Sequence, residues 1–161
     1  KLMTLVKITI AISVLLYNRK SPVLNKVFID TSGWAELFVS SESYHQQAKA
    51  WFAKARKQKI EMVTSNYVVA ELVALLNSPL RVPRSQLFQY VDAVKTASYV
   101  NVIYIDAAIE TAAWSLLKNR ADKTWSLVDA TSFIIMQQLG VQEALTTDHH
   151  FEQAGFIRLL K

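Results

Sequence analysis

Residues 26–32 read Lys-Val-Phe-Ile-Asp-Thr-Ser, a short apolar run that ends in an acid and two hydroxyl side chains. An apolar run of this length predicts a strand buried on both faces of a sheet. Helices are predicted over 33–40, 44–58, 66–77, 83–98, 106–120, 126–139 and 148–154, and further strands over 61–64, 100–105, 143–146 and 156–160. Strands that alternate with helices indicate an α/β fold in which helices cover both faces of a parallel sheet.

The composition limits the chemistry that the chain can perform. Its 161 residues correspond to one domain, and 52% hydrophobic and 19% charged residues are typical of a folded protein. The lack of cysteine excludes disulfide scaffolds, cysteine nucleophiles, zinc fingers and iron–sulfur sites. Three glycines cannot supply a glycine-rich phosphate loop, and the three histidines do not form the H-E-x-x-H zinc motif. Carboxylates, hydroxyls and lysines remain as candidates for chemistry.

The amino-terminal segment differs from the rest of the chain. Residues 1–26 contain five basic residues and no acid, and 2–17 are nearly all apolar. The longest uncharged stretch, 8–18, is shorter than the ~20 residues that span a bilayer, and no small-x-small cleavage site follows it. We therefore divide the chain into an extension, 1–25, and a domain, 26–161. The extension is interpreted as a start-site artefact without membrane contact; a disordered or docked extension and a signal or anchor are the alternatives.

The formal net charge of +5 comes from the same segment. Without the basic residues of 1–26, thirteen basic residues stand against thirteen acids. A basic total usually indicates an anionic partner, but here the excess lies almost wholly outside the domain. If the domain binds RNA, local basic patches have to provide the contacts.

Four acids lie in apolar surroundings. Asp30 closes the first strand, Asp129 stands at the start of an apolar helix, and Asp148 follows the fourth predicted strand after one residue. Glu71 lies in the helix over 66–77, where helical spacing predicts an apolar face around it. Strand ends and helix starts meet at one edge of a parallel sheet, where ligand sites usually lie. Carboxylates brought together there repel unless a cation neutralises them, and Mg²⁺ or Mn²⁺ can do so and activate a water for phosphodiester hydrolysis.

Each of these acids also has a structural interpretation. Ser126 and Asp129 have the spacing of a capping box. Asp148 stands at an N-cap position, and Asp30 can belong to a turn that caps the next helix. For these three acids taken singly, the structural interpretation is favoured. Glu71 differs because an unpaired carboxylate on an apolar helix face costs free energy, so the metal hypothesis depends mainly on Glu71.

The remaining acids and the histidines are assigned to structure or solvent. Asp106 is predicted to cap the helix after it, and Asp122 to lie in a solvated loop. Because neighbouring residues of a helix point in different directions, His149 and His150 are assigned surface or packing roles. The acids predicted to be exposed helix charges are Glu36, Glu42, Asp92 and Glu110.

Four segments in order resemble the PIN-domain family, and within it the VapC-type toxins of bacterial toxin–antitoxin pairs. They are Val-Phe-Ile-Asp30-Thr-Ser, Thr64-Ser-Asn-Tyr-Val-Val-Ala-Glu71-Leu, Trp125-Ser-Leu-Val-Asp129-Ala-Thr-Ser-Phe and Ala144-Leu-Thr-Thr-Asp148-His-His-Phe. A single Asp-Thr-Ser is a weak signal, whereas the four segments together at these separations are specific. The resemblance extends from about Lys26 to Leu160. Residues 1–25 depart from it, because family chains commonly begin just before the first strand.

This resemblance implies a three-layer α/β/α sandwich with a central, mainly parallel sheet, and an endoribonuclease that depends on Mg²⁺ or Mn²⁺. The catalytic metal ligands that it implies are Asp30, Glu71, Asp129 and Asp148, and the groups that orient carboxylates or bind phosphate are Thr31, Ser32 and Thr147. A metal-activated water is expected to attack the scissile phosphate in line, leaving a 5′-phosphate and a 3′-hydroxyl. The implied partners are an RNA substrate, a small cognate antitoxin and a second copy of the chain in a homodimer, in the cytoplasm.

Other functions fit the sequence less well. A receiver domain needs a second acid beside Asp30 and a lysine after a later strand, where this chain has Thr31 and Thr146-Thr147. A haloacid-dehalogenase-type phosphatase needs Asp-x-Asp, but the third position is Ser32. A catalytically silent PIN-like module that binds RNA or a protein partner is the remaining alternative, and the presence of all four acids argues against it. The basic residues considered for RNA binding are Lys54, Arg56, Lys57, Lys59, Arg81, Arg84, Arg120 and Lys123.

Overall fold

The computed structural model describes residues 25–161, so the predicted extension lies outside the described residues apart from Asn25. Five parallel strands form one sheet in the order β3-β2-β1-β4-β5. The strands are β1 (Lys26–Ile29), β2 (Glu61–Ser65), β3 (Val100–Ile103), β4 (Glu143–Leu145) and β5 (Ile157–Arg158). The central strand is β1, in which Phe28 lies opposite Val63 of β2 and Ala144 of β4. The apolar run of this strand is buried, as its sequence predicts.

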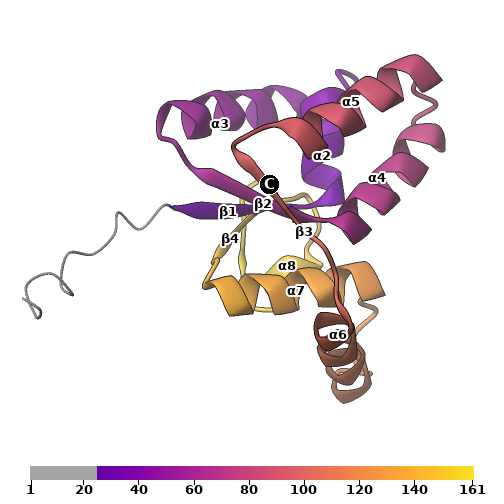
Figure 1. Cartoon of the computed structure of the whole chain (residues 1–161), viewed down its shortest axis with the longest axis vertical. Coiled ribbons are helices and arrows are strands. Elements are labelled where there is room, and N and C mark those ends of the chain that lie inside the picture. The colour runs from indigo at the N-terminus through magenta and orange to yellow at the C-terminus, as the bar shows by residue number, and fades with distance from the viewer. Residues whose placement is uncertain (1–24) are drawn as a thin grey trace, which may run out of the picture.

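Helices cover both faces of the sheet. Those of the described residues are α2 (Thr31–Phe38), α3 (His45–Lys57), α4 (Asn66–Asn77), α5 (Arg84–Thr96), α6 (Ala107–Asn119), α7 (Leu127–Leu139) and α8 (His150–Gln153). Figure 1 shows α2 to α5 on one face and α6 to α8 on the other, which confirms the three-layer α/β/α sandwich. The predicted elements are all present, with ends that differ by at most two residues. Within residues 25–161, no helix combines the length and the apolar character needed to cross a membrane.

Aromatic side chains fix the elements that surround the carboxyl end of β1. On the α2 side, Trp34 stacks on Phe38 with ring centroids 5.8 Å apart. On the other side, Phe151 of α8 lies 5.0 Å from Phe133 of α7 and 6.2 Å from Phe28 of β1. Burial of such large apolar side chains contributes strongly to the stability of the fold. It also fixes α7, which carries Asp129, and α8, which directly follows the turn that carries Asp148, relative to β1.

Gly33 allows the first turn of α2 to pack directly on β4. A Cβ atom at this position would lie 2.1 Å from the carbonyl oxygen of Leu145, a backbone atom held in the sheet. The N–H of Asp30 donates a hydrogen bond to the same carbonyl at 3.2 Å. The missing side chain of Gly33 therefore brings Asp30 and the residues after it against the carboxyl end of β4.

Gly33→Ala is expected to lower the free energy of unfolding by about 3 kcal/mol or more, because the added methyl group overpacks against backbone that cannot move aside. A matched control is Gly140→Ala, at a left-handed position (φ 65°) where the added Cβ meets none of the described atoms within 4 Å. Backbone strain there is expected to cost about 1 kcal/mol. Urea unfolding followed by tryptophan fluorescence measures both losses, and equal losses would contradict the close packing of Gly33.

Candidate functional site

A hollow opens where the carboxyl ends of β1 and β4 meet α2 and α4. Its volume is about 520 Å³, and its lining residues are Asp30, Thr31, Ser32, Glu71, Leu75, Thr147, Asp148 and His149. Three of the four predicted acids therefore share one hollow, although they come from three separate segments of the chain. The fourth acid, Asp129, is absent from this lining and lies beside it, in contact with His150.

Asp30 is held by two hydroxyl groups. Its Oδ2 accepts hydrogen bonds from Oγ of Ser32 at 3.0 Å and from Oγ1 of Thr146 at 2.9 Å. Burial raises the pKa of Asp30 from 3.8 to about 6, and the Glu71 carboxylate acts in the same direction, while the two hydroxyl groups lower the pKa. Asp30 stands at the N-cap position of α2, but its side chain makes no cap hydrogen bond to this described helix. The structural interpretation of Asp30 is therefore correct in position, but its carboxylate does not cap the helix.

Glu71 lies on the second turn of α4 and is exposed. The predicted apolar face around it is wrong, because the buried stripe of the helix includes Leu72 and Leu76, and adjacent residues are rotated by about 100° from each other. Burial therefore gives no reason for Glu71 to bind a cation. The position of Glu71 does give such a reason. Oε2 of Glu71 accepts a hydrogen bond from Oγ1 of Thr31, and the carboxylate lines the hollow beside Asp30.

Asp129 forms the predicted capping box at the start of α7. Its Oδ2 accepts from the N–H of Ser126 at 2.7 Å, and its own N–H donates to Oγ of Ser126 at 3.0 Å. The same Oδ2 lies 3.3 Å from Nδ1 of His150. The structural interpretation of Asp129 is thus confirmed. It leaves one oxygen for a ligand, because Oδ1 of Asp129 receives no hydrogen bond from residues 25–161.

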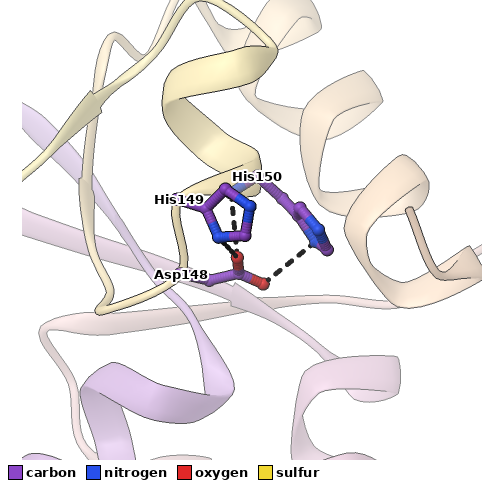
Figure 2. A group of neighbouring side chains, drawn as sticks. All are labelled: Asp148, His149 and His150. Carbon is purple, nitrogen blue, oxygen red and sulfur yellow. Dashed lines mark hydrogen bonds and ion pairs between the residues drawn. The ribbon is translucent and has the colours of Figure 1, made fainter. Parts of the chain in front are cut away.

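Asp148 and the two histidines after it come together beside the hollow. Nδ1 of His149 lies 3.5 Å from Oδ1 of Asp148, and Nδ1 of His150 lies 3.3 Å from Oδ2 (Figure 2). Oδ1 also accepts from the N–H of His150, the first residue of α8, at 2.8 Å. The N-cap residue of α8 is His149, so the predicted N-cap position of Asp148 is one residue too early. The expectation that the two rings point in different directions is wrong, since their centroids are 4.6 Å apart. The helix begins at His150, so the two residues straddle the helix start.

Thr146, the residue directly after β4, holds Asp30, a role that the sequence prediction missed. Oγ1 of Thr146 donates to Asp30 at 2.9 Å, lies 2.9 Å from Oγ of Ser32, and accepts from the N–H of Asp148 at 3.0 Å. The predicted residue, Thr147, lines the hollow, and its backbone N–H donates to Oγ of Ser32 at 3.0 Å. Strand alternation is the signal that could have distinguished Thr146 from Thr147. Successive side chains of a strand point to opposite faces, so Thr146 points to the same face as Ala144 and Thr147 points away from it. Phosphate binding by Thr147 stays a prediction.

Asp106 and Asp122 lie as predicted. Asp106 accepts a hydrogen bond from the N–H of Ile109 at 2.8 Å and so caps α6. Asp122 is exposed and pairs with Arg120 at 3.0 Å and with Lys123 at 3.2 Å. Hydrogen bonds from these two cations lower the pKa of Asp122 to about 2. Neither acid reaches the hollow.

Glu36 is buried, which corrects its prediction as an exposed charge. Its Oε2 accepts from the N–H of Tyr44 at 2.7 Å, because the turn between α2 and α3 folds back over the carboxylate. Burial raises the pKa of Glu36. Asp92 is exposed as predicted, whereas Glu42 and Glu110 are half-buried and Glu42 lies in a turn.

The basic residues considered for RNA binding lie in three places. The group at the end of α3 stands just before β2, at the amino end of the sheet and so opposite the hollow. Arg81 and Arg84 flank the start of α5. Arg120 and Lys123 belong to the loop between α6 and α7, in which Oγ1 of Thr124 lies 3.4 Å from Nε2 of His150. Of these three groups, this loop is the one that contacts the candidate site.

The donor atoms around the hollow suit a hard divalent cation. Asp30, Glu71 and Asp148 offer carboxylate oxygens, the ligands that Mg²⁺ and Mn²⁺ prefer. In the described part of the chain, no lysine or arginine pairs with Asp30 or Glu71. A bound cation would offset the cost of keeping the buried Asp30 carboxylate ionised. The residues therefore fit the metal ion that the sequence resemblance implies.

Comparison with known proteins finds a PIN domain over residues 27–157, a span that contains all four acids. The 23S rRNA-specific endonuclease VapC20 of Mycobacterium tuberculosis is 35% identical over 133 residues, which are 83% of this chain and 97% of that protein. The likeness therefore extends over nearly the whole length of this relative.

Solved structures show the same fold. The crystal structure of M. tuberculosis VapC20, described as a sarcin–ricin loop cleaving toxin, has a TM-score of 0.73 and 33% identity, covering 81% of this chain and 96% of that one. FitAcB from Neisseria gonorrhoeae has a TM-score of 0.57 and 16% identity, covering 82% and 94%. PAE2754 from Pyrobaculum aerophilum has a TM-score of 0.58 and 15% identity, covering 89% and 90%. At these low identities, the last two similarities concern the fold alone.

Proposed function

This chain belongs to the PIN domain family, and from that premise we propose that it is a metal-dependent endoribonuclease, the toxin of a type II toxin–antitoxin pair. The observation that supports this proposal most strongly is the hollow on which Asp30, Glu71 and Asp148 converge. Carboxylates that lie close together repel one another, and the cluster is unfavourable unless the site binds a cation. A module that only binds RNA or protein has no use for such a cluster.

The proposed substrate is the sarcin–ricin loop of 23S rRNA. A relative that is 35% identical and covered over 97% of its length is a 23S rRNA-specific endonuclease, and its crystal structure is described as that of a sarcin–ricin loop cleaving toxin. Phosphate contacts from basic side chains would hold the RNA backbone. Arg120 and Lys123 are the candidates on this chain, because their loop contacts His150.

The residues proposed to hold Mg²⁺ or Mn²⁺ are Asp30, Glu71, Asp129 and Asp148. When bound, such an ion supplies an activated water and stabilises negative charge on the scissile phosphodiester. The protein's own contribution is orientation: Thr31 holds the Glu71 carboxylate, while Ser32 and Thr146 hold Asp30. Thr147 lines the hollow and is proposed to contact a phosphate oxygen.

The proposed protein partners are a small cognate antitoxin and a second copy of the chain. An antitoxin tail that enters the hollow would cover the acids and silence the nuclease. We further propose that the toxin acts in the cytoplasm as a homodimer, and that residues 26–161 form the nuclease domain without the extension over 1–25.

Brief expression of the wild-type chain, followed by mapping of cut ends in total cellular RNA, tests this function. We expect growth arrest and new ends within the sarcin–ricin loop of 23S rRNA. Glu71→Gln is expected to reduce cutting by more than about 100-fold. Removing a residue that only orients a metal ligand lowers activity by up to about 100-fold, and removing the metal ligand itself is expected to lower it further. Glu110→Gln, which makes the same change on α6, is the matched control and is expected to leave cutting intact.

Different results contradict different parts of the proposal. Cuts in another RNA that depend on Glu71 would contradict the proposed substrate and support the proposed nuclease activity. Equal cutting by wild type and Glu71→Gln would attribute the ends to another enzyme. No cutting with purified protein and Mn²⁺ would favour the binding module without activity.

A further inference from the structure

His150 lies between two of the proposed metal ligands. Its Nδ1 is 3.3 Å from Oδ2 of Asp129 and 3.3 Å from Oδ2 of Asp148. Its side chain is only 17% exposed, and its backbone N–H donates to Oδ1 of Asp148 at 2.8 Å. One residue therefore contacts carboxylates from two segments, the start of α7 and the turn after β4.

The neighbours of the ring determine which nitrogen carries a hydrogen. Ionised carboxylates only accept hydrogen bonds, so Nδ1 of His150 carries a hydrogen. Its hydrogen-bond partner is Asp129, and the Asp148 carboxylate lies within ion-pair distance of the same nitrogen. On the far side of the ring, Nε2 lies 3.4 Å from Oγ1 of Thr124, and a hydroxyl can donate to it. A hydrogen bond at the second nitrogen fixes both the tautomer and the orientation of an imidazole ring.

The loop that carries Thr124 is anchored to α8. The next residue, Trp125, is buried, and its Nε1 donates to Oε1 of Gln153 at 3.1 Å. Thr124 therefore sits on a packed segment and holds a defined position beside the ring. Because Arg120 and Lys123 belong to the same loop, the proposed RNA contacts and the two acids are linked through Thr124 and His150.

We infer that His150 is a positioning residue, which fixes the carboxylates of Asp129 and Asp148 relative to each other and is itself oriented by Thr124; this inference rests on the proposed function. Oδ2 of Asp129 already accepts from the N–H of Ser126, and His150 contacts the same atom, so Oδ1 remains for the ion. His149 also contacts Asp148 (Figure 2), but its side chain is 63% exposed. The bridge between the two acids comes from His150 alone among the described histidines.

Mn²⁺ affinity of the full chain, measured by electron paramagnetic resonance without RNA, tests this role directly. His150→Leu is expected to weaken Mn²⁺ binding by about 10- to 100-fold, as for other residues that orient metal ligands. His150→Asn keeps an N–H near the position of Nδ1 and is expected to restore affinity to within about fivefold of wild type. Thr124→Val is expected to weaken binding by about threefold or more, whereas its matched control Thr111→Val, on the exposed face of α6, has no effect.

Cleavage of a sarcin–ricin stem-loop RNA separates positioning from RNA binding. In His150→Leu we expect kcat to fall by about the same factor as Mn²⁺ affinity, with KM for RNA changed by less than about threefold.

Unchanged Mn²⁺ affinity and unchanged kcat in His150→Leu, measured beside an active wild type, would overturn the inference but not the proposed nuclease function. A wild type that cuts no RNA, together with weakened Mn²⁺ binding in His150→Leu, would keep the inference and overturn the proposed function. If His150→Leu does not fold, the Mn²⁺ affinities of His150→Asn and Thr124→Val test the inference instead. A Thr124→Val protein that binds Mn²⁺ as tightly as wild type would overturn it.

Discussion

Replacing Asp30 with Asn is expected to lower RNA cleavage by about 1000-fold and, at the same time, to stabilise the metal-free protein at pH 7 by about 3 kcal/mol. The loss of cleavage follows from the place of Asp30 on the hollow, where it is proposed to hold the ion. Asn is nearly the same size as Asp, and its amide oxygen can still accept from Ser32 and Thr146. The substitution therefore removes a charge while it keeps the packing.

The gain in stability follows from the raised pKa of Asp30. The unfolded chain loses this proton near pH 3.8, whereas the folded chain keeps it to about pH 6. Between these values the folded state binds more protons than the unfolded state, so the stability of the wild type falls as pH rises from about 4 to 6. Each tenfold change in proton affinity corresponds to about 1.4 kcal/mol, so the total is about 3 kcal/mol. Asn carries no charge and avoids this loss.

Urea unfolding of wild type and Asp30→Asn in EDTA, at pH 4 and pH 7, measures the effect. The two proteins are expected to have similar stability at pH 4 and to differ at pH 7. Asp92→Asn, on the exposed surface of α5, removes the same charge and is expected to change neither stability nor cleavage appreciably. A destabilised Asp30→Asn protein at pH 7 would contradict the burial of an ionised carboxylate in the resting site.

The position of Asp30 could be predicted from sequence because it depends on local patterns. An apolar run predicts a buried strand, and the residue after such a strand lies at the carboxyl edge of a parallel sheet. Asp148 after β4 follows the same rule, and the capping box of Asp129 is set by a spacing of three residues. Each of these positions needs only neighbours along the chain.

The wrong predictions concern contacts between distant residues or the exact face of a helix. Glu71 lies one residue away from Leu72 in the buried stripe, and that single step turns it from the core to the hollow. Glu36 is covered by Tyr44 across a turn whose path the helical spacing does not contain. Whether a charged side chain is buried therefore depends on tertiary packing that local periodicity does not specify.

The histidine pair was misassigned because the helix was predicted to begin too early. With a helix from Asp148, adjacent rings diverge; with a helix from His150, the preceding turn brings both rings to one carboxylate. A signal for the later start was available, because an Asp two residues before a helix commonly accepts from the backbone N–H at that point. Asp148 does so with His150 at 2.8 Å.

Removal of divalent ions is expected to abolish RNA cleavage by the wild type, and Mn²⁺ or Mg²⁺ is expected to restore it. The reason is that the negatively charged carboxylates on the hollow cannot offset charge on a phosphate, whereas a bound ion does so and also lowers the pKa of a bound water. Cleavage of the stem-loop RNA in excess EDTA, before and after Mn²⁺ is added back, measures this. Full cleavage in EDTA would exclude the metal mechanism.

The same ion is expected to offset the loss of stability that the metal-free protein shows as pH rises. A metal ligand has to be deprotonated, so protonation of Asp30, with its pKa of about 6, competes with the ion. We expect Mn²⁺ to bind about tenfold more weakly at pH 5 than at pH 8, and to stabilise the wild type at pH 8 by about 2.7 kcal/mol when its concentration is 100 times Kd. Thermal unfolding with and without Mn²⁺ measures the gain, with Asp92→Asn behaving as wild type and Asp30→Asn gaining little. A Mn²⁺ effect of equal size in Asp30→Asn would place the ion away from the hollow.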